Sequence, residues 1–198
     1  MRQEYIITVM GRDRLGVIAD VTRAVLKLEG RVHELSQTVL RGFFTVIFAA
    51  TFPEGTDEEA IQRTIAAQGA PNEFCIGVKR CPLGFEWKPP PATGRFILTA
   101  QGPDRPDLIH RIAAYLSDKG INIEDFYAQP QDGESVLILQ VYIPDTWDIY
   151  QLQLDLEELG REVGLTSHLQ HENIFRVTSE IAAVRRLAQR RGDRSRGR

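Results

Sequence analysis

The strongest constraint on the fold is that the chain repeats itself. Residues 11–18, Gly-Arg-Asp-Arg-Leu-Gly-Val-Ile, align with residues 102–109, Gly-Pro-Asp-Arg-Pro-Asp-Leu-Ile, at an offset of 91 positions. The same offset pairs apolar positions further along the chain: Val21 with Ile112, Val25 with Leu116, Val32 with Ile123, Val46 with Leu137, Phe48 with Leu139 and Ala50 with Val141. Agreement at one offset over about 40 residues predicts a duplicated folding unit.

Each copy has the periodicity of a βαββαβ unit. Tyr5, Ile7 and Val9 alternate as in a half-buried strand, and apolar residues then recur at helical spacing over 18–28. For the rest of the first copy we expect strands at 32–40, 43–52 and 73–81, a hairpin at Arg41-Gly42, and a helix that Thr56 caps and that ends near Gly69. For the second copy we expect strands at 96–101, 121–129, 134–143 and 165–175, with helices at 106–119, 146–160 and, more weakly, 177–191.

This element order predicts an α+β protein of two tandem ferredoxin-like domains. In each domain an antiparallel four-stranded sheet would carry both helices on one face, because connections between strands of one sheet follow a right-handed rule. The expected boundaries are domain 1 at 1–82, a linker at 83–94, domain 2 at 95–176, and a C-terminal helix with a basic tail at 177–198. The linker contains three successive prolines, which favour an extended conformation and cannot join a sheet.

The charge of the chain is unevenly distributed. Seven arginines and one aspartate lie between Arg185 and Arg198, so this tail carries +6 of a chain whose net charge is −3, and residues 1–184 carry −9. An acidic body argues against nucleic-acid binding by the folded part. The sequence also lacks an N-terminal signal pattern and an apolar run long enough to cross a membrane, so we expect a cytoplasmic protein.

Residues with catalytic or metal-binding chemistry are few and scattered. Cys75 and Cys81 lie an even number of positions apart on one predicted strand, so they would share a face as reduced, partly buried thiols. His168 and His171 would point to opposite faces of another strand. His33 has no nucleophile arranged beside it by motif, and the same holds for His110. We therefore expect no enzyme activity, no metal site and no cofactor.

The two copies of the repeat resemble the ACT domain signature. In that family an Asp-Arg-Pro-Gly turn joins the first strand to the first helix, and an Asn-Ile pair opens the second strand. The matching residues here are Asp13, Arg14, Leu15, Gly16 and Val17 with Arg31 in copy one, and Asp104, Arg105, Pro106 and Asp107 with Asn122 and Ile123 in copy two. Tandem ACT-like repeats that end in His-Glu-Asn-Ile-Phe resemble the glycine cleavage system transcriptional repressor group.

The chemistry of such a turn suits an amino acid as ligand. A tight turn into a helix leaves backbone N–H groups free for a carboxylate, and a glycine lets the ligand approach the backbone closely. Asp13 could hold an ammonium group, and the amide of Asn122 could both donate and accept hydrogen bonds. The resemblance implies that the ligand lies between two ACT domains.

The copies depart from the family pattern in complementary ways. Copy one keeps Gly16 but has Arg31 in place of Asn, while copy two keeps Asn122 but has Asp107 in place of Gly. We therefore expect one complete site formed by the turn of copy one and the strand of copy two. The reciprocal site, Asp104, Arg105 and Pro106 with Arg31, would be degenerate.

Several plainer interpretations remain open. Asp13 and Asp104 could only cap their helices, Gly16 could only allow close packing, and Asn122 could only open its strand. The chain could also be an adaptor or dimerisation module without a ligand. An RNA-binding RRM shares the βαββαβ order, and residues 41–48 partly match its third-strand motif, but Thr45 occupies the position of a stacking aromatic residue.

Taken together, the sequence predicts a regulatory protein that binds a small amino acid, with glycine and serine as first candidates. Its partners would be that ligand, a regulatory protein that it controls, and a second copy in a homodimer. The folded body would bind neither nucleic acid nor membrane. Because there is no helix-turn-helix pattern, any effect on transcription would pass through another regulator.

Overall fold

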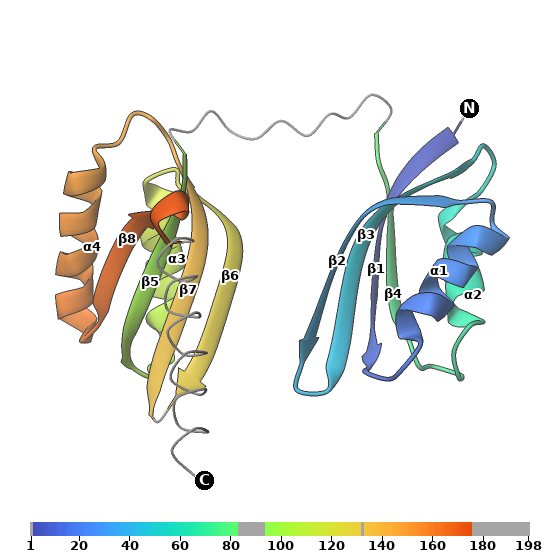
Figure 1. The fold of residues 1–198 in the computed structure, drawn as a ribbon, viewed down its shortest axis with the longest axis horizontal. Helices are drawn as coiled ribbons and strands as arrows, with labels where there is room; N and C mark the ends of the chain where they lie inside the picture. The colour runs from blue at the N-terminus through green and yellow to red at the C-terminus, as the bar shows by residue number, and fades with distance from the viewer. Residues whose placement is uncertain (1, 83–93, 132, 176–198) are drawn as a thin grey trace, which may run out of the picture. The chain divides into compact units, whose positions relative to one another are not determined.

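The computed structural model describes residues 2–82, 94–131 and 133–175 (Figure 1). They belong to two compact units, Met1–Trp87 and Lys88–Arg198, called domain 1 and domain 2 below. The predicted linker lies outside the described residues except for Gly94, which begins a strand, and the predicted C-terminal helix and tail lie outside them entirely.

Domain 1 has the predicted order of elements. They are β1 (Arg2–Arg12), α1 (Val17–Lys27), β2 (Arg31–Leu40), β3 (Phe43–Pro53), α2 (Glu58–Ala66) and β4 (Cys75–Arg80). The sheet has the strand order β2-β3-β1-β4 with antiparallel neighbours throughout. Figure 1 shows α1 and α2 on the same face of this sheet, which leaves the other face open.

Domain 2 repeats this arrangement. Its elements are β5 (Gly94–Pro103), α3 (Leu108–Asp118), β6 (Asn122–Gln131), β7 (Glu134–Ile143), α4 (Ile149–Val163) and β8 (Thr166–His171). The strand order is β6-β7-β5-β8, again antiparallel. The two sheets confirm the prediction of tandem ferredoxin-like domains.

The offset of 91 residues holds for fine details as well as for whole elements. A register shift interrupts β2 between Val32 and Glu34, and a matching shift interrupts β6 91 positions later. The amide of Asp13 donates to the carbonyl of Gly42 (2.9 Å), and the corresponding bond joins Asp104 to Gly133 (3.3 Å). The duplication therefore extends to the turns that flank the candidate site.

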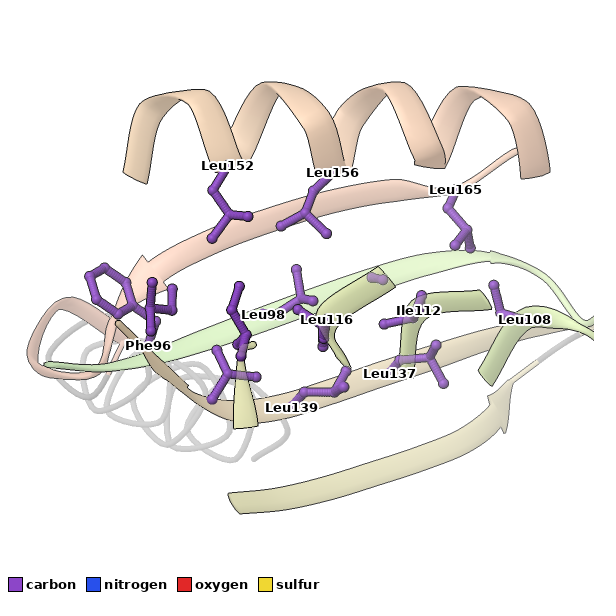
Figure 2. Close-up of a cluster of buried hydrophobic side chains, with 14 residues drawn as sticks. Phe96, Leu98, Leu108, Ile112, Leu116, Leu137, Leu139, Leu152, Leu156 and Leu165 are labelled. Atoms are coloured by element: carbon purple, nitrogen blue, oxygen red, sulfur yellow. The ribbon is translucent and has the colours of Figure 1, made fainter. Parts of the chain in front are cut away.

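The core of each domain follows from strand and helix periodicity. Alternate residues of each central strand face the helices and are buried, and in domain 2 Ile97 and Tyr142 on the opposite face are buried as well. In domain 2, Figure 2 shows Leu152 and Leu156 pointing from α4 toward Leu98 and Leu139 of the sheet. All four are at most 3% exposed, as expected for side chains whose removal from water stabilises the fold.

Two helix starts differ from the prediction. The cap of α2 is Asp57, whose carboxylate accepts from the amide of Ala60 (2.6 Å), and not Thr56. The carbonyl of Thr56 instead accepts a hydrogen bond from the hydroxyl of Tyr5 (2.7 Å). In domain 2, Asp148 caps α4 in the same way, so this helix begins later than predicted. Thr and Asp are both good caps, and in α2 it is the side chain of Asp57 that reaches a free amide.

Two further expectations are wrong in part. The last strand ends at His171, and residues 172–175 are helical, so the predicted strand over 165–175 is too long. Cys75 is exposed and Cys81 is buried just beyond the end of β4, so the two thiols are not equally and partly buried. Both cysteines are free. Within the described parts of the chain, no helix has the length and apolar character to cross a membrane.

Candidate ligand-binding site

The turn between β1 and α1 has the geometry of an uncapped helix start. Gly16 occupies the N-cap position with φ of 85°, in the left-handed region, and no side chain caps the helix. A Cβ at this position would have no atom within 4 Å, so glycine is needed for its conformation and not for lack of room. The first amides of α1, beginning with Val17, therefore have no side-chain acceptor among the described residues.

The carboxylate of Asp13 is also free. Its side chain is exposed and accepts no hydrogen bond from any described residue, although its backbone amide anchors the turn to Gly42. Beside it, Leu15 is 99% exposed. The capping alternative is wrong for this residue, because the N-cap of α1 is Gly16 and not Asp13.

Arg14 links the turn to α1 and to the segment before β4. Its guanidinium pairs with Glu73 (2.5 Å) and with Asp20 (2.8 Å), and lies over the ring of Phe74. The hydrogen bonds from Arg14 hold the pKa of Asp20 and of Glu73 below their ordinary values. The structure thus gives Arg14 a positioning role, and direct contact of Arg14 with a ligand stays a prediction.

The glycine that opens each copy of the motif has a packing role. A Cβ on Gly11 would lie 2.8 Å from the carbonyl oxygen of Glu73, and a Cβ on Gly102 would lie 2.6 Å from that of Gly164. Both positions therefore require glycine, because the backbone before the last strand passes too close for a side chain. This contact fixes the end of the first strand, and hence the start of the turn, in both domains.

The corresponding turn of domain 2 has paired its polar groups internally. Asp107 replaces the glycine and has φ of −90°, so the turn takes a different path. Arg105 binds both carboxylate oxygens of Asp107 at 3.1 Å and thereby lowers the pKa of Asp107. The hydroxyl of Ser135 donates to Asp104 (2.6 Å), which likewise does not cap the helix. A hollow of about 280 Å³ lies here, lined in part by Pro106.

The predicted strand residues lie at the opposite end of each sheet from the turns. Asn122 opens β6, is exposed, and lines a shallow hollow of about 370 Å³ together with Ser117 and the half-buried Ile123. Arg31 holds the equivalent position at the start of β2 and is exposed. Because a strand rises about 3.3 Å per residue, the turn and the strand start of one domain are roughly 25 Å apart. A single domain therefore does not bring the two halves of the predicted site together.

A further hollow was not predicted from the sequence. It has a volume of about 630 Å³, lies beside the start of α2 and is lined by Arg2, Gln3, Tyr5, residues 54–59 and Arg80. Residues that line it form two hydrogen bonds with one another. The hydroxyl of Tyr5 donates to the carbonyl of Thr56, and the amide of Arg80 donates to the carboxylate of Glu58 (2.9 Å). The acidic residues after Thr56 indicated a helix start in the sequence, but they did not indicate a hollow beside it.

The described residues give little support to metal binding or to RNA binding. No three His, Cys, Asp or Glu side chains within residues 2–82, 94–131 and 133–175 are placed to hold a metal ion. In the RRM-like motif of β3, Phe44 and Phe48 are buried in the core, and Thr45 lies on the open face. Only Phe43 of the motif's aromatic residues reaches that face, whereas RNA stacking needs several exposed rings.

Comparisons with known proteins agree with the duplication. A family model of the ACT domain matches residues 3–79 and again residues 95–170. A UPF0237 protein of Methanosarcina mazei is 38% identical over 66 residues, which are 33% of this chain and 72% of that protein.

Two solved structures resemble both domains. An unknown protein from Galdieria sulphuraria has a TM-score of 0.70 at 23% identity, covering 86% of this chain and 99% of that one. A proposed glycine cleavage system transcriptional repressor has a TM-score of 0.64 at 15% identity, covering 86% of this chain and 97% of that one. At these identities the likeness establishes the fold alone.

Proposed function

The chain belongs to the ACT domain family, and from that premise we propose that it is a regulatory protein, not an enzyme, that binds a small amino acid and controls a partner. The observation that carries the proposal is the contrast between the two turns. The turn of domain 1 keeps a left-handed Gly16, uncapped amides and a free carboxylate at Asp13. In domain 2 the matching Asp104 and Asp107 are already paired.

The turn of domain 1 offers complementary groups for a zwitterion. Amides at the start of α1 suit the carboxylate of an amino acid, because they carry the positive end of the helix dipole. The carboxylate of Asp13 suits its ammonium group. Leu15 would cover the bound ligand from solvent, and the buried side chain of Val17 leaves only its backbone amide for the ligand.

The second part of the proposal is that another ACT domain completes the site. Within one domain the turn and the strand start are roughly 25 Å apart, so they cannot hold the same small molecule. We assign Asn122 and Ile123 as the strand half that serves the turn of domain 1. Arg31 would serve the turn that contains Asp104, Arg105 and Pro106, giving a degenerate second site.

Glycine and serine are the first amino acids to test. The reason is the structural resemblance to a protein named as a glycine cleavage system transcriptional repressor. Control of transcription would pass through another regulator, because no helix-turn-helix is among the described elements. The alternative is an adaptor that dimerises and has lost its ligand.

Thermal shift of the full chain against the twenty amino acids tests the proposal. A ligand at 100 times its dissociation constant should stabilise the protein by about 2.7 kcal/mol, whereas an adaptor would not respond. Asp13→Asn should abolish the shift because it removes the counter-charge for the ammonium group.

Asp104→Asn is the matched control for this experiment. Its carboxylate is already bonded to Ser135, so the control should respond to the ligand as the parent protein does. Equal loss of response in both variants would contradict the assignment of the working site to domain 1.

A further inference from the structure

The open face of the domain 1 sheet carries exposed apolar side chains. This is the face away from α1 and α2, seen edge-on in Figure 1. Met10, Leu40, Phe43 and Ile47 lie on it and are 46–70% exposed. Exposed apolar side chains gathered on one face mark interaction surfaces more often than they mark free surface.

The strand register arranges this face in rows that cross the sheet in the order β2, β3, β1, β4. The rows are Glu34–Ala49–Ile6–Lys79, Ser36–Ile47–Thr8–Gly77 and Thr38–Thr45–Met10–Cys75. In the two central positions of every row, one side chain is large and the other is small. The large residue alternates between β1 and β3 from row to row.

This alternation makes the face complementary to itself. A twofold axis parallel to the strands would place β3 of one copy on β1 of a second copy, with each row on its own equivalent. Ile6 would then meet the second copy's Ala49, Met10 its Thr45, and Ile47 its Thr8. Interdigitation of large with small side chains is how the inner faces of two packed sheets fit together.

The charges at the edges of the first row fit the same axis. Glu34 on β2 and Lys79 on β4 are exposed, and neither has an ion-pair partner in the described chain. Three strand spacings, about 14 Å, separate them within one sheet, which is too far for a direct contact. The twofold axis would place Glu34 of each copy opposite Lys79 of the other.

The open face of domain 2 is more polar than that of domain 1 at several matching positions. Gln101 occupies the position of Met10 and donates to Glu134 (2.6 Å), which occupies that of Phe43. Arg95 donates to the hydroxyl of Tyr142 (2.7 Å) and to Glu124 (3.0 Å). The open face of domain 2 thus replaces the apolar residues Met10 and Phe43 by a polar pair, although Ile97 and Ile138 keep the positions of Ile6 and Ile47.

We propose that the open face of the domain 1 sheet is the interface of a homodimer, in which two copies stack face to face about a twofold axis parallel to the strands. A sheet face of this size would bury about 1,000 Å² in total, at the lower end of specific interfaces. The dimer should therefore dissociate in the micromolar range.

Sedimentation of the full chain over a range of concentrations tests this interface. Lys79→Glu should weaken dimerisation at least tenfold because it places two pairs of like charges across the interface, and Glu34→Lys should do the same. The double variant Glu34→Lys with Lys79→Glu should restore the parent dissociation constant. Gln170→Glu, at the domain 2 position equivalent to Lys79, is the matched control and should have no effect.

The rescue distinguishes this interface from other dimers. A dimer joined through the edge of β2 could weaken on mutation of Glu34, but exchanging its charge with Lys79 would not restore it. A parent protein that stays monomeric at 100 µM, or single variants that dimerise normally, would overturn the proposal.

Zero-length carbodiimide crosslinking gives an independent readout. It should join Glu34 to Lys79 in the dimer band, as identified by peptide mass spectrometry, since within one copy these residues are too far apart to react. A dimer band whose crosslinks exclude this pair would contradict the stacked arrangement.

Discussion

In each domain an ion pair connects the first helix to a neighbouring segment, and the helix residue in that pair is acidic in domain 1 and basic in domain 2. In domain 1 the arginine is on the turn, and Arg14 reaches Asp20 of α1 and Glu73 before β4. In domain 2 the position of Asp20 is taken by Arg111, which reaches Glu162 of α4 (2.8 Å). Both first helices are thus anchored by an ion pair, but the charge on the helix residue is reversed between the domains.

The two turns also differ in which polar side chains are paired. Because Arg14 is engaged elsewhere, the carboxylate of Asp13 stays free, and the left-handed glycine leaves the helix amides open. In domain 2, Arg105 pairs with Asp107 of its own turn and with no other residue of the described part of the domain. The two turns therefore differ in their polar groups: the carboxylate of Asp13 accepts no hydrogen bond from a described residue, whereas those of Asp104 and Asp107 do.

The largest expected effect tests whether the two domains are separate folding units. Phe48→Ala removes a core ring of domain 1 that is 2% exposed, and it should lower the free energy of unfolding of that domain by about 3–5 kcal/mol. Hydrogen exchange should then accelerate in β1, β3 and β4 and stay unchanged in domain 2. Leu139→Ala, at the equivalent position of domain 2, should give the mirror result. Faster exchange in both domains after either change would show that they do not fold separately.

A smaller effect is expected from the backbone of the turns. Gly16→Ala forces a side chain into the left-handed region and should destabilise domain 1 by about 1–2 kcal/mol. Asp107→Ala, where φ is −90°, should cost much less. Urea unfolding of the two variants measures the difference, and equal midpoints would contradict the assigned conformations.

The smallest effect concerns alkaline pH and a buried tyrosine of domain 2. Burial, with a lesser contribution from Asp155, raises the pKa of Tyr115 to about 12. Because the folded pKa lies above the ordinary value of 10, the contribution of Tyr115 is complete below pH 10 and is lost as the pH rises toward 12. The position in domain 1 is Ala24, so this contribution of a buried tyrosine belongs to domain 2. Hydrogen exchange at pH 10 and above would show this, and Tyr115→Phe should abolish it.

Much of the fold could be predicted because the repeat supplies each element twice. The first hairpin turn and the buried faces of the helices follow from local signals such as Arg41-Gly42 and the apolar spacing of α1. Local signals fail where two residues compete for one role, as Thr56 and Asp57 do at the start of α2. They also failed at the end of β8, where 172–175 leave the sheet as a helical turn.

The candidate site was less predictable because its contacts span long separations. The Asp13–Val17 turn could be found by motif, but the pairing of Arg14 with Glu73 joins residues 59 positions apart. Nothing local indicates that Ser135 would satisfy Asp104, 31 positions away. Which turn is free therefore emerges only from the folded chain.

Calorimetric titration of the full chain with glycine and serine tests this difference most directly. We expect one amino-acid site per chain, and no heat of binding after Asp13→Asn. Two equal sites per chain would show that the turn of domain 2 is as receptive as that of domain 1, which would contradict the contrast between them.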